Sequence, residues 1–185
     1  VEFVHNASVM GAVAKCGLQL YRFGQTVSIP YFDEDWKPTS FYGKIRANSA
    51  QDSHSLLLLD IKTKEPDYKK LARVGGKVTY LPPRFMSVNE AIDQLLEAEA
   101  QHREGVLSAE STFAVGLARL GQPDERLVAG TLRQLQGLDF GGPLHSVVIC
   151  APTLHELERR FLDVFCLRPE DCEPRRPPPS AEDDE

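Results

Sequence analysis

Apolar and polar residues alternate along the chain in blocks typical of a protein that mixes strands and helices. Apolar runs of strand length predict strands at residues 1–6, 26–31, 55–61, 112–120 and 145–151. Segments with helical spacing predict helices after Ser8 and at residues 41–47, 87–105, 126–138 and 153–167. Strands and helices therefore follow one another in turn, which predicts the α/β class, although the connection lengths leave a parallel or a mixed sheet open.

Two of the predicted helices begin with a capping-box signal. In this signal a hydroxyl and a carboxylate three residues apart each accept a hydrogen bond from a free backbone N–H at the helix start. Ser87 with Glu90 and Thr153 with Glu156 have this spacing. The buried faces of these helices are predicted to carry Val88, Ile92, Leu95 and Leu96 in the first, and Leu154, Leu157, Phe161 and Val164 in the second.

Two glycines stand inside predicted elements. Gly116 lies within the strand 112–120, where a missing side chain indicates the close approach of another backbone or a ligand. Gly130 lies within the helix 126–138, where glycine costs about 1 kcal/mol relative to alanine. For Gly130 the sequence favours close packing over a ligand.

Composition and charge limit the classes of partner. With 185 residues, 42% of them hydrophobic, the chain can bury one sizeable core. The formal net charge is −6, of which residues 168–185 carry −4, so the remainder offers no basic surface for nucleic acid and no attraction to an anionic membrane. No apolar run is long enough to cross a membrane.

Candidate metal and nucleophile sites are weak. The four cysteines lack the spacing of zinc ligands, and Cys150 within an apolar run is predicted to be a small buried hydrophobe with a reduced thiol. The acids at 33–35 are typical of a solvated turn, so we predict no metal site. No recognisable motif pairs a nucleophile with a base.

The turn before the first predicted helix is a candidate binding site for an anionic group. Asn6 or Ser8 can cap this helix, and the free backbone N–H groups there would favour an anionic ligand group, although an ordinary helix cap explains the same residues. Several short sequence segments, in this order along the chain, resemble one family: HNASVM (5–10), CGLQLY (16–21), LLDIK (58–62), PPRFMSVN (82–89), VGLAR (115–119), AGTLRQ (129–134) and PLHS (143–146). The chain resembles the diphthine methyl ester synthases over residues 1 to about 167.

The resemblance implies an S-adenosylmethionine-dependent methyltransferase of the tetrapyrrole-methylase-like class, which acts in diphthamide biosynthesis. It implies that residues 1–17 are a remnant strand and linker helix of a parallel N-terminal domain, and that 18–167 form a mixed-sheet C-terminal domain. Residues 168–185 are expected to be a disordered acidic, proline-rich tail. The family's glycine-rich loop and Gly-Asp-Pro turn are not found here, so we expect this C-terminal portion to be inactive or weak alone.

The resemblance also implies the cofactor-binding residues. Ser8 and Val9 match positions at the methionine end of S-adenosylmethionine, and Leu59, Leu120 and His145 match positions around its adenosine. From the residues alone, Leu59 could equally be core and His145 a strand-entry histidine bonded to backbone. No catalytic base is identified, and three arginines could orient an acceptor carboxylate or lie at the surface: Arg84, Arg119 and Arg133.

The implied acceptor is the modified histidine of translation elongation factor 2, in the cytoplasm, and the family suggests a homodimer. S-adenosylhomocysteine would be the product of the cofactor. An alternative from a different class is a non-catalytic C-terminal module that dimerises or docks on a partner protein. Methyl transfer requires mainly the positioning of donor and acceptor, so the lack of a catalytic motif fits both hypotheses.

Overall fold

The computed structural model describes residues 8–67 and 78–167, with a five-stranded mixed sheet at its centre. The strands lie in the order β1 (Val27–Ile29), β2 (Ser55–Leu59), β7 (His145–Ile149), β5 (Phe113–Ala118) and β6 (Arg126–Thr131). β1 pairs with β2 in parallel, and the other three pairs are antiparallel. The predicted α/β class with a mixed sheet is confirmed, whereas the predicted strand 1–6 and the tail 168–185 lie outside the described residues.

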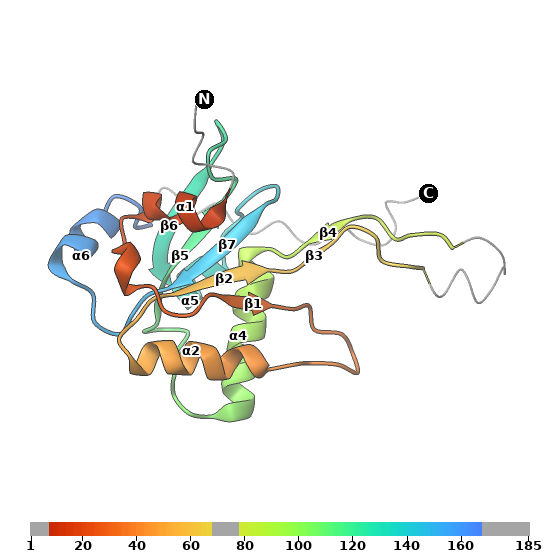
Figure 1. The fold of residues 1–185 in the computed structure, drawn as a ribbon, viewed down its shortest axis with the longest axis horizontal. Coiled ribbons are helices and arrows are strands. Elements are labelled where there is room, and N and C mark those ends of the chain that lie inside the picture. The colour runs from red at the N-terminus through yellow and green to blue at the C-terminus, as the bar shows by residue number, and fades with distance from the viewer. Residues whose placement is uncertain (1–7, 68–77, 168–185) are drawn as a thin grey trace.

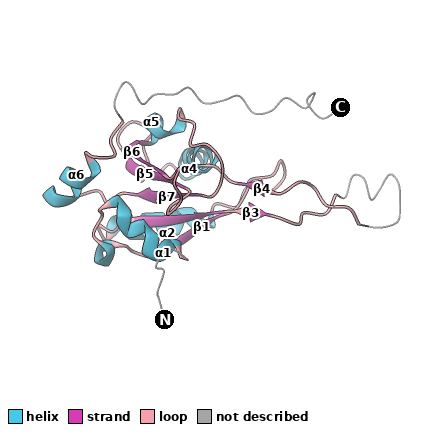
Figure 2. Ribbon diagram, turned by 90° about the horizontal axis from the view of Figure 1, so that it is seen from above, coloured by secondary structure: helices cyan, strands magenta, loops and turns pink. Residues whose placement is uncertain are grey.

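Helices cover both faces of this sheet (Figures 1 and 2). One face packs against α2 (Ser40–Ala50), α4 (Val88–His102) and α5 (Leu132–Gln136), which with the sheet form the larger apolar core. The other face packs against α1 (Val9–Ala12), the 3-10 turn η1 (Val13–Cys16) and α6 (Glu156–Leu162). Since side chains of a strand alternate between its two faces, β5 and β2, which is apolar after Ser55, supply both cores.

Helix α4 follows its sequence signal closely. The Ser87 hydroxyl accepts from the Glu90 N–H, and the Glu90 carboxylate accepts from the Ser87 N–H at 2.7 Å, so the predicted capping box is confirmed. Val88, Ile92 and Leu95 are fully buried on the predicted face. The helix ends at His102, where the next residue turns left-handed, slightly earlier than the predicted end near Gly105.

The prediction of one helix over residues 126–138 is wrong. Residues Arg126–Thr131 form β6, which pairs along its whole length with β5, and α5 begins only at Leu132. Thr131 and Gln134 form a capping box at this point, with the Gln134 Oε1 accepting from the Thr131 N–H at 2.8 Å. Gly130 therefore lies in a strand, and a Cβ there would approach Gln134 Oε1 to 2.9 Å.

The start of α6 differs from its prediction by two residues. His155, not Thr153, is the N-cap, and its ring Nδ1 accepts from the Leu157 N–H at 3.2 Å. Glu158, not Glu156, closes the capping box, because its carboxylate accepts from the His155 N–H at 2.9 Å. The chain thus enters the helix one half-turn later than the sequence signal indicated.

The predicted inner face of α6 is also wrong. Leu157, Phe161 and Val164 are 63%, 50% and 69% exposed, whereas Glu158 and Leu162 are each 1% exposed. The physical reason is that Glu158 bonds to buried polar partners under the helix, and this turns the apolar residues on either side outward.

A short hairpin extends from the sheet and was not predicted. β3 (Ile61–Lys62) pairs antiparallel with β4 (Arg84–Phe85), and together they project from the body of the protein (Figures 1 and 2). The predicted strand 55–61 is divided at Asp60, whose backbone carbonyl accepts from the Met86 N–H at 3.0 Å. The hairpin therefore begins directly after β2 ends at Leu59.

Two further predictions concern small residues of the core. A Cβ at Gly116 would collide with the ring of Phe140 and lie 3.3 Å from Val88, so a side chain makes the close approach, and neither a backbone nor a ligand is needed to explain this glycine. Cys150 is buried, as predicted, and burial raises the pKa of its thiol far above the usual range. Both residues are thereby part of the packing.

Candidate cofactor cleft

A cleft of about 730 Å³ lies at the end of the sheet where β2 and β5 stop and β7 begins. Four of the five residues predicted to bind the cofactor line it: Val9, Leu59, Leu120 and His145. The fifth, Ser8, is the N-cap of α1, directly before Val9. Segments far apart in the sequence are brought together because β7 lies between β2 and β5 in the sheet.

The first of these segments enters through α1. The Ser8 hydroxyl accepts from the Met10 N–H at 3.3 Å, so Ser8 caps this helix as predicted. The α-helix is four residues long and passes into η1, which limits the field at its N-terminus. Binding of a carboxylate by the amides of Ser8 and Val9 remains a prediction, and it would depend on individual N–H groups.

The walls of the cleft are largely aliphatic. Leu59 closes β2 and is nearly buried, and Leu120 follows β5 at an intermediate exposure. Ile61 and Leu144 stand at the mouth with 47% and 55% of their surface exposed. Apolar walls of this kind suit the flat faces of an aromatic ring, and the volume lies in the range of small-molecule sites.

His145 is bonded to backbone on both sides of its ring. Its Nδ1 accepts from the Val88 N–H at 3.3 Å, so the proton of the neutral ring is on Nε2, which donates to the Gly142 carbonyl at 2.9 Å. Burial lowers the pKa of His145, and the positive charge of Arg119 adds to this lowering. The neutral imidazole therefore fixes the loop before β7, and a contact from His145 to a ligand would come from its backbone or its ring face.

Arg119 fixes the same loop from the other side. Its Nη1 donates to the carbonyls of Phe140 at 2.8 Å and Gly142 at 2.5 Å, and its Nε donates to Asp124 Oδ2 at 2.7 Å. The residue has a φ of +50°, a conformation that costs a non-glycine residue energy and that these bonds hold in place. Arg119 and His145 thus share the Gly142 carbonyl as a common anchor.

None of the three arginines considered in the sequence is without a partner. Arg84 forms a double hydrogen bond with Glu65 at 3.0 Å, and Arg133 bonds to Glu110 at 2.9 Å. Arg119 alone among the three lines the cleft. The sequence did not reveal the role of Arg119 in the loop. The only local signal is the glycine pair at 141–142, and this turn comes close to Arg119 only once the sheet has formed.

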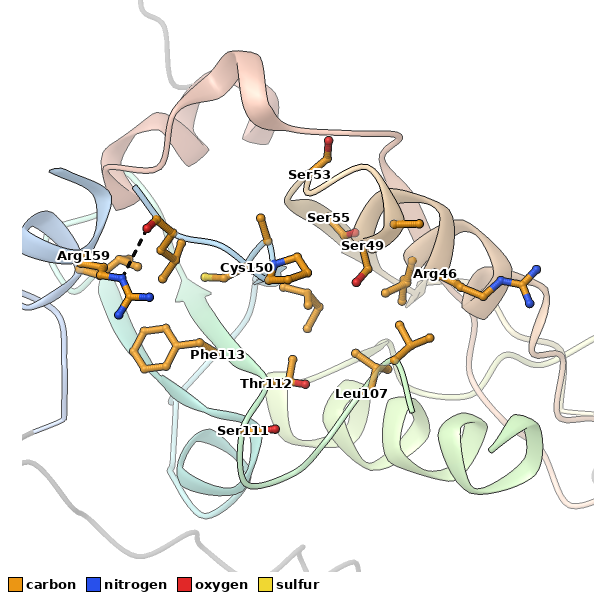
Figure 3. A pocket seen from close by; sticks show the side chains of 18 of the residues that line it. Arg46, Ser49, Ser53, Ser55, Leu107, Ser111, Thr112, Phe113, Cys150 and Arg159 are labelled. Atoms are coloured by element: carbon orange, nitrogen blue, oxygen red, sulfur yellow. Dashed lines mark hydrogen bonds between the residues drawn. The ribbon is translucent and has the colours of Figure 1, made fainter. Parts of the chain in front are cut away.

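A second and larger cleft lies at the opposite end of the sheet, between α2, α6 and the start of β5 (Figure 3). It contains none of the residues predicted to bind the cofactor. Among the described residues there is no cluster of three or more potential metal ligands, and every helix there is too short or too polar to cross a membrane.

Comparisons with known proteins agree with the resemblance read from the sequence. The chain is 55% identical over 165 residues to a protein of Arabidopsis thaliana assigned as a diphthine methyl ester synthase, covering 89% of this chain and 58% of that protein. It is 48% identical over 169 residues to the diphthine methyl ester synthase of Mus musculus, covering 90% and 59%. No family model matches.

The fold comparison gives the same result. The crystal structure of a protein assigned as a diphthine synthase from Entamoeba histolytica superposes with a TM-score of 0.78 at 41% identity, covering 91% of this chain and 61% of that one. The chain spans 58% and 59% of the length of the two curated relatives described above. By sequence and by fold, it belongs to the diphthine methyl ester synthase family.

Proposed function

We propose that this protein takes part in S-adenosylmethionine-dependent methyl transfer in diphthamide biosynthesis, with the modified histidine of translation elongation factor 2 as acceptor, in the cytoplasm. The observation that carries the proposal is the convergence of Val9, Leu59, Leu120 and His145 on one cleft. These positions come from four separate segments, and the family resemblance implies a cofactor contact for each of them.

The chemistry of the cleft fits the adenosine part of the cofactor. The aliphatic side chains that line it, Leu59 and Leu120 among them, would pack on the purine ring and remove apolar surface from water. Bound S-adenosylmethionine supplies a methyl group already activated by its positive sulfur. The residues of this chain are therefore required to bind, orient and exclude water, and no acid or base is assigned among them.

The test is a calorimetric titration with S-adenosylhomocysteine. Leu144→Asn changes an exposed residue at the cleft mouth, and Leu157→Asn changes a comparably exposed residue on α6 that does not line the cleft. We expect the first variant to bind about fivefold to tenfold more weakly, from about 1 kcal/mol of lost apolar contact, and the second to bind like the parent protein. Absence of binding by the folded protein, or an equal loss in both variants, would refute the proposed site.

The alternative function, a module that dimerises or docks on a partner, also has structural support. Leu157 and Phe161 expose apolar surface on α6 and Val164 exposes it just after the helix, together with Tyr21 at 82% exposed on η2 (Leu20–Arg22). Exposed apolar side chains of this size favour a contact with another surface. Sedimentation analysis of the parent protein and of Val164→Asp would test the homodimer, because a charge on a buried contact face should shift the protein toward the monomer.

A further inference from the structure

The larger cleft has a volume of about 930 Å³ and lies where β2 and β5 begin and β7 ends. It is thus separated from the cofactor cleft by the length of the sheet. Figure 3 shows its side chains converging from α2, from the loop before β5, from the end of β7 and from α6. Neither the proposed methyl transfer nor the family relationship assigns it a role.

The floor of this cleft is apolar and uncharged. Ile45, Ile149 and Leu162 are 1%, 5% and 1% exposed, and Phe113 adds a partly exposed aromatic ring. The Cys150 side chain faces the centre of the cleft in Figure 3, and burial raises the pKa of its thiol, so it stays neutral. A ligand here would bury an apolar body against this floor.

Two hydroxyl groups beside the floor are not used by the protein itself. Within the described residues, the side-chain hydroxyls of Ser49 and Ser111 make no hydrogen bond, although both residues line the cleft. Arg46 also lines it, but its guanidinium pairs with Glu104 at 2.5 Å and points away from the cleft in Figure 3. Two hydroxyl groups are therefore available to a ligand.

Arg159 provides the positive charge. Its Nε donates to the Leu154 carbonyl at 3.4 Å, and no carboxylate of the described residues lies within 4.0 Å of its guanidinium. Figure 3 shows this guanidinium above Phe113 at one end of the cleft. Asp163 lines the cleft one helical turn further on, so the field at this end has a positive and a negative contribution.

We propose that this cleft binds a small organic anion with an apolar body, whose acid group pairs with Arg159 while its body covers the floor. Guanidinium groups bind carboxylate, sulfonate and phosphate oxygens through charge-assisted hydrogen bonds, and an arginine without an internal carboxylate is free to do so. The negative charge of Asp163 repels such a ligand, so removing this charge should strengthen binding, whereas removing the charge of Arg159 should weaken it. The proposal does not depend on the methyltransferase function.

The probe is 8-anilino-1-naphthalenesulfonate, which joins a sulfonate to an apolar aromatic body and fluoresces when bound. Arg159→Gln should weaken its binding about fivefold to tenfold, as for loss of a partly exposed charged hydrogen bond, and Asp163→Asn should strengthen it about twofold to threefold. The control is Arg160→Gln, whose side chain pairs with Glu156 on the surface and does not line the cleft. Equal effects of Arg159→Gln and Arg160→Gln would overturn the proposal.

A matched pair of tryptophan substitutions locates the probe. Ser49→Trp places a bulky ring in the cleft, whereas Ala47→Trp places the same ring on the exposed side of α2. Binding should be lost in the first variant and kept in the second, with unchanged far-ultraviolet circular dichroism in both. Full binding by a folded Ser49→Trp variant would place the probe elsewhere. N-phenyl-1-naphthylamine has no charge, and if Arg159→Gln weakened its binding as much as that of the sulfonate probe, the charge pairing would be excluded.

Discussion

The buried carboxylate of Glu158 allows a quantitative prediction of stability. It accepts four hydrogen bonds: Oε1 from the Gln19 N–H at 2.9 Å and from His54 Nε2 at 3.0 Å, and Oε2 from Arg22 Nη1 at 2.8 Å and from the His155 N–H at 2.9 Å. Burial alone would raise the pKa of Glu158, but the two backbone N–H groups and His54 outweigh it and hold the pKa below its ordinary value. The group is therefore ionised and fully bonded.

The substitution Glu158→Gln removes the charge and replaces one acceptor oxygen with a donor. Each carboxylate oxygen faces two donors, so either placement of the amide NH₂ sets donor against donor. Breaking a buried ion pair on one side costs about 3–5 kcal/mol. Arg22 keeps its pairing with Asp52 at 2.8 Å, which places the expected loss at the lower end, about 3 kcal/mol.

The assay is urea denaturation followed by circular dichroism, with Glu156→Gln as control. Glu156 lies on the same helix with its side chain 72% exposed, and its pairing with Arg160 is a surface ion pair worth less than about 0.5 kcal/mol. We expect the free energy of unfolding to fall by about 3 kcal/mol in the first variant and to stay nearly constant in the second. If the two variants differ by less than about 1 kcal/mol, the buried network does not support α6 as described.

Three further outcomes follow from the same structure. Acid should destabilise the protein. Burial lowers the pKa of His54 below 6.5, so its contribution to the free energy of unfolding is present above this pH and is lost as the pH falls, and the contribution of Glu158 is lost below 4.5. Urea denaturation across this pH range would show the loss, and a flat profile would contradict it. Gly116→Ala should cost about 1–3 kcal/mol by collision with Phe140, and Phe140→Leu in the same chain should recover part of it in thermal melts; a neutral Gly116→Ala would contradict the packing. Arg119→Lys should weaken S-adenosylhomocysteine binding about tenfold in calorimetry, because a lysine cannot bond to the loop carbonyls and to a carboxylate together, and unchanged affinity would separate the loop from the cleft.

The elements that the sequence predicted well are those with a strong local signal. Helix α4 has a capping box at Ser87 and an apolar stripe in register with it, and the structure keeps both. Strand β2 is four consecutive leucines after Ser55, as expected for a strand covered on both faces. In these cases local preference and tertiary packing favour the same structure.

The errors arose where a polar contact between distant segments decided the outcome. In α6 the apolar spacing favoured burial of Phe161, but the bonds from Glu158 to Arg22 and His54 fixed a different face inward. The apolar spacing of residues 126–131 is compatible with a helix or a strand. Pairing with β5 makes this segment the strand β6, and the capping box at Thr131 marks the start of the helix that follows. Periodicity over a short segment carries no information about such partners.

In the candidate cleft, the apolar residues and the polar residues have different roles. Val9, Leu59 and Leu120 line it with apolar side chains, and their contact with the cofactor, which the family resemblance implies, stays a prediction. The polar residues act differently: Arg119 and His145 both bond to the Gly142 carbonyl, so their hydrogen bonds hold a wall of the cleft.

This division suits a reaction that requires positioning more than proton transfer. In the proposed methyl transfer, a methyl group on a positive sulfur would need an acceptor aligned at the correct distance, and a rigid wall would serve this by limiting the motion of the donor. A neutral His145, with its pKa lowered by burial and by Arg119, keeps its bond to Gly142 throughout the physiological range of pH. The polar groups of the cleft are therefore best understood as the support of a binding surface, and a loss of either anchor should appear first as weaker cofactor binding.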